Sequence, residues 1–261
     1  MTAKELIQAG RLSDARVKLA EEIKAAPTNA GVRTLLFQVL AFCGEWDKAG
    51  RHLDLLAMRN DKAATGVQVY KNFVTAEKAR GAVLRGERLP EFMTPEPAYL
   101  SLCFAFRESL AAGRIDEASS LCAEIEALLP EVSGEADGVP FGGFLDTDAS
   151  LFPFLELFIH DRYLWIPFTS LRELSIPQPT TLMDLLWTPA RVVTTEGLTS
   201  NCFLPVLYPE TASQENEPTR MGKMTDWREV APGFYRGFGQ HVYQVGEEEK
   251  SLLELREVTF G

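Results

Sequence analysis

Two aspartates stand two positions apart in the segment GGFLDTD, directly after a pair of glycines. Asp146 and Asp148 could bind a metal ion or act as the acid and the base of a hydrolase. Their D-x-D spacing begins like a calcium loop, but Leu151 stands where such a loop needs glycine, and Glu156 comes too early to close it. A capped turn, or hydrogen bonds that join two domains, explains the pair better.

The three histidines are the other candidates for chemistry: His52, His160 and His241. None of them belongs to an HExxH motif, and the sequence has no GxSxG, P-loop or GxGxxG motif. The segment GFGQH leads into an expected strand, so no helix N-terminus follows that could hold phosphate. We therefore expect no catalytic residue, no metal and no cofactor. The remaining enzymatic hypothesis is a hydrolase that uses Asp146, Asp148 and His160.

Composition narrows the function classes further. The four cysteines form no CxxC pair and have apolar neighbours, which predicts buried thiols (Cys43, Cys103, Cys122 and Cys202). No apolar run reaches the 18 residues of a membrane span, and the N-terminal sequence has no apolar signal core, so we expect a cytoplasmic protein.

Charge is distributed unevenly along the chain. Of its net charge of −11, residues 136–261 carry −9, with 9 basic and 18 acidic residues. This acidic half disfavours nucleic acid and anionic membranes as partners. A basic or mixed-charge protein segment is easier to accommodate, although acidic residues can also serve solubility alone.

A short turn occurs three times in the first half, as AGRLSDA, CGEWDKA and AGRIDEA. Its glycines, Gly10, Gly44 and Gly113, are separated by 34 and 69 residues, which is close to one and two periods of 34. This period, with helical patterning on both sides, is typical of tetratricopeptide (TPR) repeats. Glycine ends the first helix of each pair, and an alanine five positions later lets the two helices approach closely. The run KAATGVQVYKNFVTAEKARGAVLRG predicts an irregular additional repeat.

The pattern changes after Pro130. The Gly-rich segment EVSGEADGVPFGGF indicates a linker, and LFPFLELFIHDRYLWIPF predicts a β hairpin that turns near His160. We expect an α+β protein with TPR-like helices in residues 1–132, a linker in 133–145, and a small antiparallel sheet or barrel-like domain with short helices in 146–261.

Aromatic residues are concentrated in this second half. Tyr and Trp are enriched at interface hot spots, although they also fill small β cores. Both faces of the RYLWIPF strand are apolar, so we expect it to be covered on both sides. The candidate partner-binding residues are Tyr163, Trp165, Trp187, Tyr208, Trp227, Asp146 and Asp148.

Seven segments occur in an order that resembles the ImpE/TagJ family, also called SciE-type proteins: GGFLDTD, RYLWIPF, LMDLLWTPAR, FLPVLYP, MGKMTDW, GFGQHVY and LLELREVTF. Members of this family are accessory proteins of bacterial type VI secretion systems. The resemblance implies a non-catalytic adaptor that binds the N-terminal helix of the small sheath subunit, TssB. It also implies an indirect role in sheath assembly or in recycling by the ATPase ClpV. A chaperone for a secreted effector is the alternative binding function.

Overall fold

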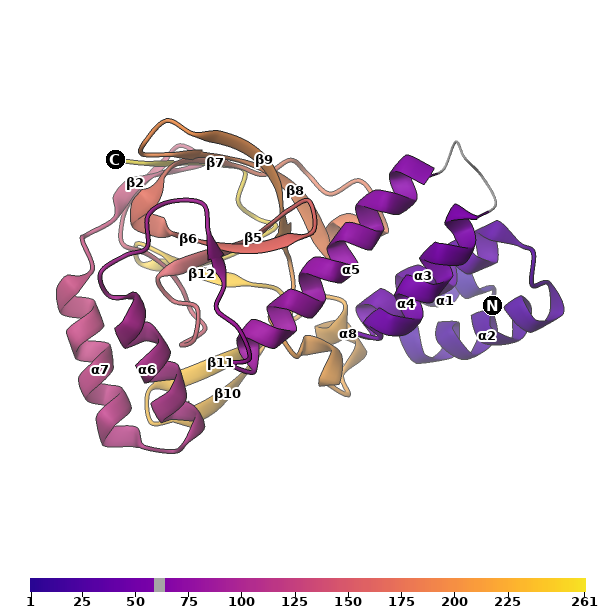
Figure 1. The fold of residues 1–261 in the computed structure, drawn as a ribbon, viewed down its shortest axis with the longest axis horizontal. Helices are drawn as coiled ribbons and strands as arrows, with labels where there is room; N and C mark the ends of the chain where they lie inside the picture. Colours follow the sequence, from indigo (N-terminus) through magenta and orange to yellow (C-terminus); the bar gives the residue numbers. More distant parts are fainter. Residues whose placement is uncertain (59–63) are drawn as a thin grey trace.

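The protein combines paired helices in its first half with a mainly antiparallel sheet in its second half (Figure 1). The computed structural model describes residues 1–58 and 64–261. The α+β class expected from the sequence is confirmed. Within these described ranges, no helix has both the length and the apolar character needed to cross a membrane.

Three helix pairs contain the repeated turn. Their helices are α1 (Ala3–Gln8) with α2 (Leu12–Ala25), α3 (Ala30–Phe42) with α4 (Trp46–Ala57), and α6 (Leu100–Ala111) with α7 (Ile115–Leu128). The turn glycines Gly10, Gly44 and Gly113 have φ angles of 78°, 66° and 69°, a conformation that glycine adopts without a Cβ clash. The alanine five positions after each glycine is fully buried where the helices meet (Ala15, Ala49 and Ala118). The sequence therefore predicted the helix pairs correctly.

The pairs do not form one continuous stack. Helix α5 (Ala64–Leu84) follows α4 as the long helix that the sequence predicted, although Lys62 and Ala63 lie outside the described residues. The short strand β1 (Glu91–Phe92) then joins the sheet by pairing in parallel with β6 (Arg162–Pro167). Helices α6 and α7 consequently lie away from α1–α4, on the other side of α5 (Figure 1).

The described residues form one nine-stranded sheet and two small ones. The order in the large sheet is β1-β6-β5-β9-β8-β7-β14-β2-β3, with β5 (Phe154–Ile159), β9 (Thr199–Pro205), β8 (Trp187–Thr194), β7 (Leu171–Ser175), β14 (Glu257–Phe260), β2 (Ser133–Ala136) and β3 (Val139–Gly142). The small sheets are β10 (Asp226–Ala231) with β11 (Phe234–Phe238), and β13 (Glu248–Ser251) with β12 (Val242–Val245) and β4 (Phe144–Asp146). The large sheet is more extensive than expected, and it is open because β1 and β3 are edges that do not pair with each other.

The segment expected to be a linker is instead part of the sheets. Residues 133–145 contain β2, β3 and the start of β4, and Asp137 and Gly138 form the tight turn between β2 and β3 with positive φ angles. An Asp-Gly pair is a strong hairpin signal that the linker interpretation overlooked. A Cβ on Gly134 would lie 1.9 Å from the carbonyl oxygen of Thr259 on β14. The glycine there permits close backbone approach, and it does not indicate flexibility. The division into two domains near residue 132 stays a prediction.

The predicted hairpin around His160 is confirmed. Strands β5 and β6 pair from Phe154 opposite Pro167 to Ile159 opposite Arg162, and His160 takes a φ of 56° in the turn. Nearly every residue of the two strands is buried, and α5 packs against β6. The ring of Phe104 on α6 stacks on Trp165 at 6.1 Å between centroids. Helices from the first half thus cover this hairpin.

Three shorter segments complete the fold. A short 3₁₀ helix (Phe168–Ser170) leads into β7, and Leu182–Leu185 forms a second 3₁₀ turn with Thr181 as its cap. The polar segment 209–220 contains a 3₁₀ turn (Thr211–Ser213) and α8 (Glu217–Arg220). It packs against the N-terminal helices, because Glu217 accepts a hydrogen bond from the Ser13 N–H at 2.7 Å.

Candidate functional site

A network of charged side chains lies buried between α5 and the sheet. Arg80 of α5 donates from Nε and Nη2 to the two carboxylate oxygens of Glu156 on β5, at 2.9 and 2.5 Å. The Nη2 atom also donates to the carbonyl oxygen of Leu207, at 2.9 Å, and Nη1 lies 3.6 Å from the carboxylate of Glu77. Each of the three charged side chains is at least nine-tenths buried. Arg80 therefore connects the long helix to two separate parts of the sheet region.

His241 lies between two carboxylates of the same network. Its Nδ1 is 2.7 Å from Asp146 and its Nε2 is 3.2 Å from Glu156. Burial disfavours the imidazolium, but the two neighbouring carboxylates outweigh it and raise the pKa of His241 to about 9. Both ring nitrogens are engaged, so His241 has no free nitrogen with which to accept a proton from a substrate.

The pKa values of the acidic members depend on which cation each one faces. Burial opposes ionisation of Glu156, but Arg80 and His241 hold its pKa well below the usual range. Burial raises the pKa of Glu77, and Arg80 offsets this rise only in part. Burial likewise raises the pKa of Asp146, and His241 offsets that rise only in part. The network is thus built from ion pairs of unequal strength, with the Arg80–Glu156 pair at its centre.

The D-x-D aspartates form a hydrogen-bonded turn. Asp146 accepts from the backbone N–H of Asp148 at 2.8 Å and from the hydroxyl of Tyr208 at 2.8 Å. Asp148 accepts from Arg236 Nε at 3.0 Å and from the Gly237 N–H at 2.9 Å. The two carboxylates have the structural role of a capped turn, as the sequence analysis favoured over a calcium loop.

The aromatic candidates converge on the same network. Trp187 donates to Glu77 at 2.8 Å, and Tyr163 donates to Glu156 while accepting from Trp165. Tyr208 packs against Trp227, with ring centroids 5.6 Å apart. Of the seven residues proposed for partner binding, six are at most 3% exposed, and Trp227 alone is accessible, at 38%. The structure therefore places six of the seven in the interior and leaves Trp227 accessible beside Tyr208.

Sequence reasoning assigned no functional role to three members of the network, Glu77, Arg80 and Glu156, and it considered His241 without identifying its partners. Two signals were available. Glu156 interrupts an otherwise apolar strand, and Glu77 and Arg80 stand three positions apart, on one face of a helix. The third residue of the hydrolase hypothesis, His160, lies instead in the β5–β6 turn and is exposed. Within the described residues, no group of three or more His, Cys, Asp or Glu side chains is arranged to hold a metal ion.

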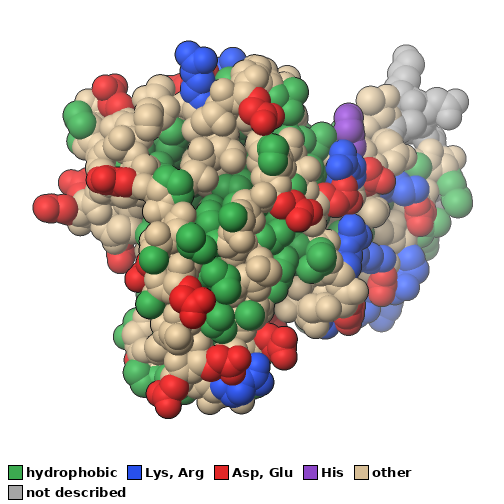
Figure 2. Space-filling view, turned by 60° about the vertical axis from the view of Figure 1, so that its left-hand side comes forward, with side chains coloured by type: hydrophobic (Ala, Val, Ile, Leu, Met, Phe, Trp, Pro, Cys, Tyr) green, Lys and Arg blue, Asp and Glu red, His purple; other side chains and the backbone are tan. Residues whose placement is uncertain are grey.

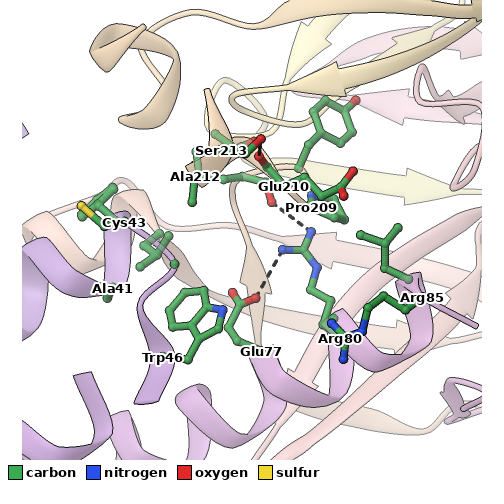
Figure 3. Close-up of a pocket in the computed structure, with 18 residues that line it drawn as sticks. Ala41, Cys43, Trp46, Glu77, Arg80, Arg85, Pro209, Glu210, Ala212 and Ser213 are labelled. Carbon is green, nitrogen blue, oxygen red and sulfur yellow. Dashed lines mark hydrogen bonds and ion pairs between the residues drawn. The ribbon is translucent and has the colours of Figure 1, made fainter. Parts of the chain in front are cut away.

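The network borders an open pocket of about 450 Å³ (Figure 3). The pocket is formed by the α3–α4 turn, by α5 and by residues 207–213. In Figure 3 the Arg80 guanidinium points from α5 toward the loop that carries Pro209 and Glu210, and Trp46 and Cys43 lie on the opposite wall. The loop is held close to the helices, because a Cβ on Gly44 would lie 2.9 Å from that of Ala212. The pocket thus lies between the helical half and the sheet half of the protein.

Known proteins share both the fold and part of the sequence of this chain. Residues 138–259 match the family model described as ImpE protein. The chain is 31% identical over 260 residues to the "Type VI secretion system accessory component TagJ" of Pseudomonas aeruginosa, covering 100% of this chain and 91% of that protein. Its fold resembles the crystal structure of protein VPA1032 from Vibrio parahaemolyticus, with a TM-score of 0.87 and 23% identity, covering 99% of this chain and 97% of that one. The chain belongs to the ImpE/TagJ family.

Proposed function

We propose that the protein is a non-catalytic accessory component of a bacterial type VI secretion system. The observation that carries this proposal is the 31% identity to TagJ along the whole chain, which includes both the helix pairs and the sheet region. An accessory role requires a stable scaffold with surfaces for other proteins. Paired helices that pack on a large sheet suit that role.

The arrangement of the titratable groups supports a role without catalysis. Both nitrogens of His241 face carboxylates, Asp146 accepts a hydrogen bond from the turn backbone, and Asp148 accepts one from Arg236. General acid–base catalysis needs such a group within reach of a substrate. These side chains are buried and paired, so they stabilise the junction between α5 and the sheet.

The proposed partner is the N-terminal helix of the small sheath subunit TssB, bound in the bacterial cytoplasm. Through this contact the protein would modulate sheath assembly or ClpV-dependent recycling of the sheath. An amphipathic helix can lie in a groove between packed elements with its apolar face inward. The pockets at both sides of α5 supply such grooves.

A titration of the intact protein with a fluorescently labelled TssB N-terminal peptide tests this proposal. We expect saturable binding, and no binding of a scrambled peptide of equal composition. Circular dichroism of the peptide in helix-favouring solvent would establish that it can form a helix. If the soluble, helix-competent peptide does not bind, TssB binding through this helix is contradicted.

A further inference from the structure

A second open pocket, of about 470 Å³, lies at the C-terminal end of α5. It is bounded by α5, by the segment up to Leu89, by α6 and by Arg236 of β11. Four of its lining residues are arginines (Arg85, Arg88, Arg107 and Arg236), and Glu108 is its one acidic lining residue. In a chain with a net charge of −11, this is a local concentration of positive charge.

Three of these arginines already have carboxylate partners. Arg85 is 2.7 Å from Glu87, Arg88 is 3.3 Å from Glu91, and Arg236 is 3.0 Å from Asp148.

Within the described part of the chain, Arg107 has no ion-pair partner. Its Nη2 donates to the carbonyl oxygen of Val83 at 3.3 Å, while its Nη1 is buried and has no hydrogen-bond partner among the described residues. The guanidinium lies over the ring of Trp165, 5.4 Å from the centroid. A buried guanidinium donor without a hydrogen-bond partner costs free energy of folding. Its planar arrangement of N–H groups matches the two oxygens of a carboxylate, so a carboxylate is the partner that suits it.

Apolar side chains make up another part of the pocket wall. They include Leu84, Leu89, Phe104 and Ala111, and the side chain of Leu89 is 64% exposed. Figure 2, which turns the α6–α7 side of the molecule forward, shows hydrophobic side chains gathered along the middle of that face, with acidic side chains around them. Leu84 and Arg85 also line the pocket of Figure 3, so the two pockets meet at the end of α5.

We propose that this pocket binds an acidic side chain of the partner helix, with the carboxylate on Arg107 and the neighbouring apolar residues of that helix against Leu84 and Leu89. The inference rests on the proposed function, and it names the part of the protein that the TssB helix contacts. Charge complementarity selects this occupant, because the other three arginines are paired, whereas Arg107 has no carboxylate partner among the described residues. The surrounding acidic surface disfavours a helix that is acidic throughout, so the partner segment is of mixed charge.

Fluorescence anisotropy with the labelled TssB N-terminal peptide tests the proposal on the intact protein. Arg107→Met keeps the packing of the side-chain stem and removes the guanidinium. We expect it to weaken binding by about tenfold or more. Arg107→Lys keeps the charge without the fork and should give an intermediate Kd. Arg191→Met is the matched control, because Arg191 is an exposed arginine of β8 that pairs with Glu173, and neither residue lines the pocket.

Peptide variants identify the acidic side chain. Each Asp or Glu of the peptide is changed to its amide, one at a time, and titrated against wild type and the Arg107 variants. One change should weaken binding to wild type by about the same factor as Arg107→Met and cause little further loss in that variant. If Arg107→Met fails to fold, the coupling between the peptide change and the protein change is measured with Arg107→Lys.

Two results would overturn the proposal in distinguishable ways. Wild-type affinity in folded Arg107→Met, or the absence of any coupled acidic position, rejects the pocket and leaves TssB binding intact. Failure of the wild-type protein to bind the peptide rejects the proposed function together with the pocket.

Discussion

Arg80 and Glu156 form a two-point ion pair across the junction of α5 and β5, although they are 76 positions apart in the chain. Their side chains are 5% and 2% exposed. Two charges that are removed from water in this way are stable only as a pair, because either one alone keeps its desolvation cost without a counter-charge. The pair therefore fixes how the long helix lies on the sheet.

Breaking this pair should be strongly destabilising. We expect Glu156→Gln to lower the free energy of unfolding by about 3–5 kcal/mol, since Arg80 is left buried without its main partner. Urea unfolding monitored by circular dichroism measures the change. Glu173→Gln is the matched control, because Glu173 is likewise a strand glutamate paired with an arginine, Arg191 of β8, but that pair is exposed. The control should change stability by about 1 kcal/mol or less, and equal losses in both variants would contradict the argument.

Stability should also fall in mildly alkaline solution because of His241. Its pKa in the folded protein, about 9, lies above the ordinary value of 6.5. The protonated form therefore stabilises the fold fully below about pH 6.5, and this contribution is lost as the pH rises through 9. At about 1.4 kcal/mol per pKa unit, the loss is on the order of 3 kcal/mol.

Unfolding of wild type and of His241→Gln between pH 6 and 9.5 would reveal this contribution. The variant should be less stable at pH 6 and show a flatter pH dependence across the window. His52→Gln is the control, because burial lowers the pKa of His52, so its contribution to stability increases rather than falls as the pH rises. Parallel profiles for wild type and His241→Gln would show that the imidazolium is not the source.

Gly134 should be intolerant of any side chain. A Cβ there would meet the Thr259 carbonyl at 1.9 Å, so Gly134→Ala has to separate β2 from β14. We expect a loss of about 1–3 kcal/mol or more, as for other overpacked sites. Gly142→Ala on the neighbouring strand is the comparison, since its nearest contact would be Glu131 at 3.8 Å. Thermal unfolding of both variants measures the difference in their stability. Equal melting temperatures would show that Gly134 is not required for the close approach of β2 and β14.

The cysteines should react slowly in the folded protein. Burial raises the pKa of the Cys103 and Cys202 thiols to about 12, so almost no reactive thiolate exists near neutral pH. Titration with Ellman's reagent should detect these two only after denaturation, and four thiols in total without a reductant, because all four are free. Fast native labelling of Cys202 would contradict its burial.

The sequence by itself determined the local structure of the first half. Each turn requires a residue in the left-handed conformation, and each close helix contact requires a small side chain. These local requirements are met by glycine and alanine, so the turns are visible in the spacing of Gly10, Gly44 and Gly113. The β5–β6 hairpin was likewise predictable from its two apolar runs around His160. The ordered segments of the second half were enough to indicate the ImpE/TagJ family.

Only the tertiary structure decided which residues meet. The linker interpretation failed at Gly134, because a glycine that permits close strand pairing has the same composition signal as a flexible one. The partners Arg80, Glu156 and His241 come from distant parts of the chain, so no local pattern relates them. Trp165 and Tyr208 could have been surface or core in the sequence alone. Trp165 is interior because Phe104 and Arg107 of α6 lie over its ring, whereas Tyr208 is enclosed by Trp227, Gly237 and His241 of the second half. The same long-range packing leaves Arg107 at the pocket without a carboxylate partner among the described residues.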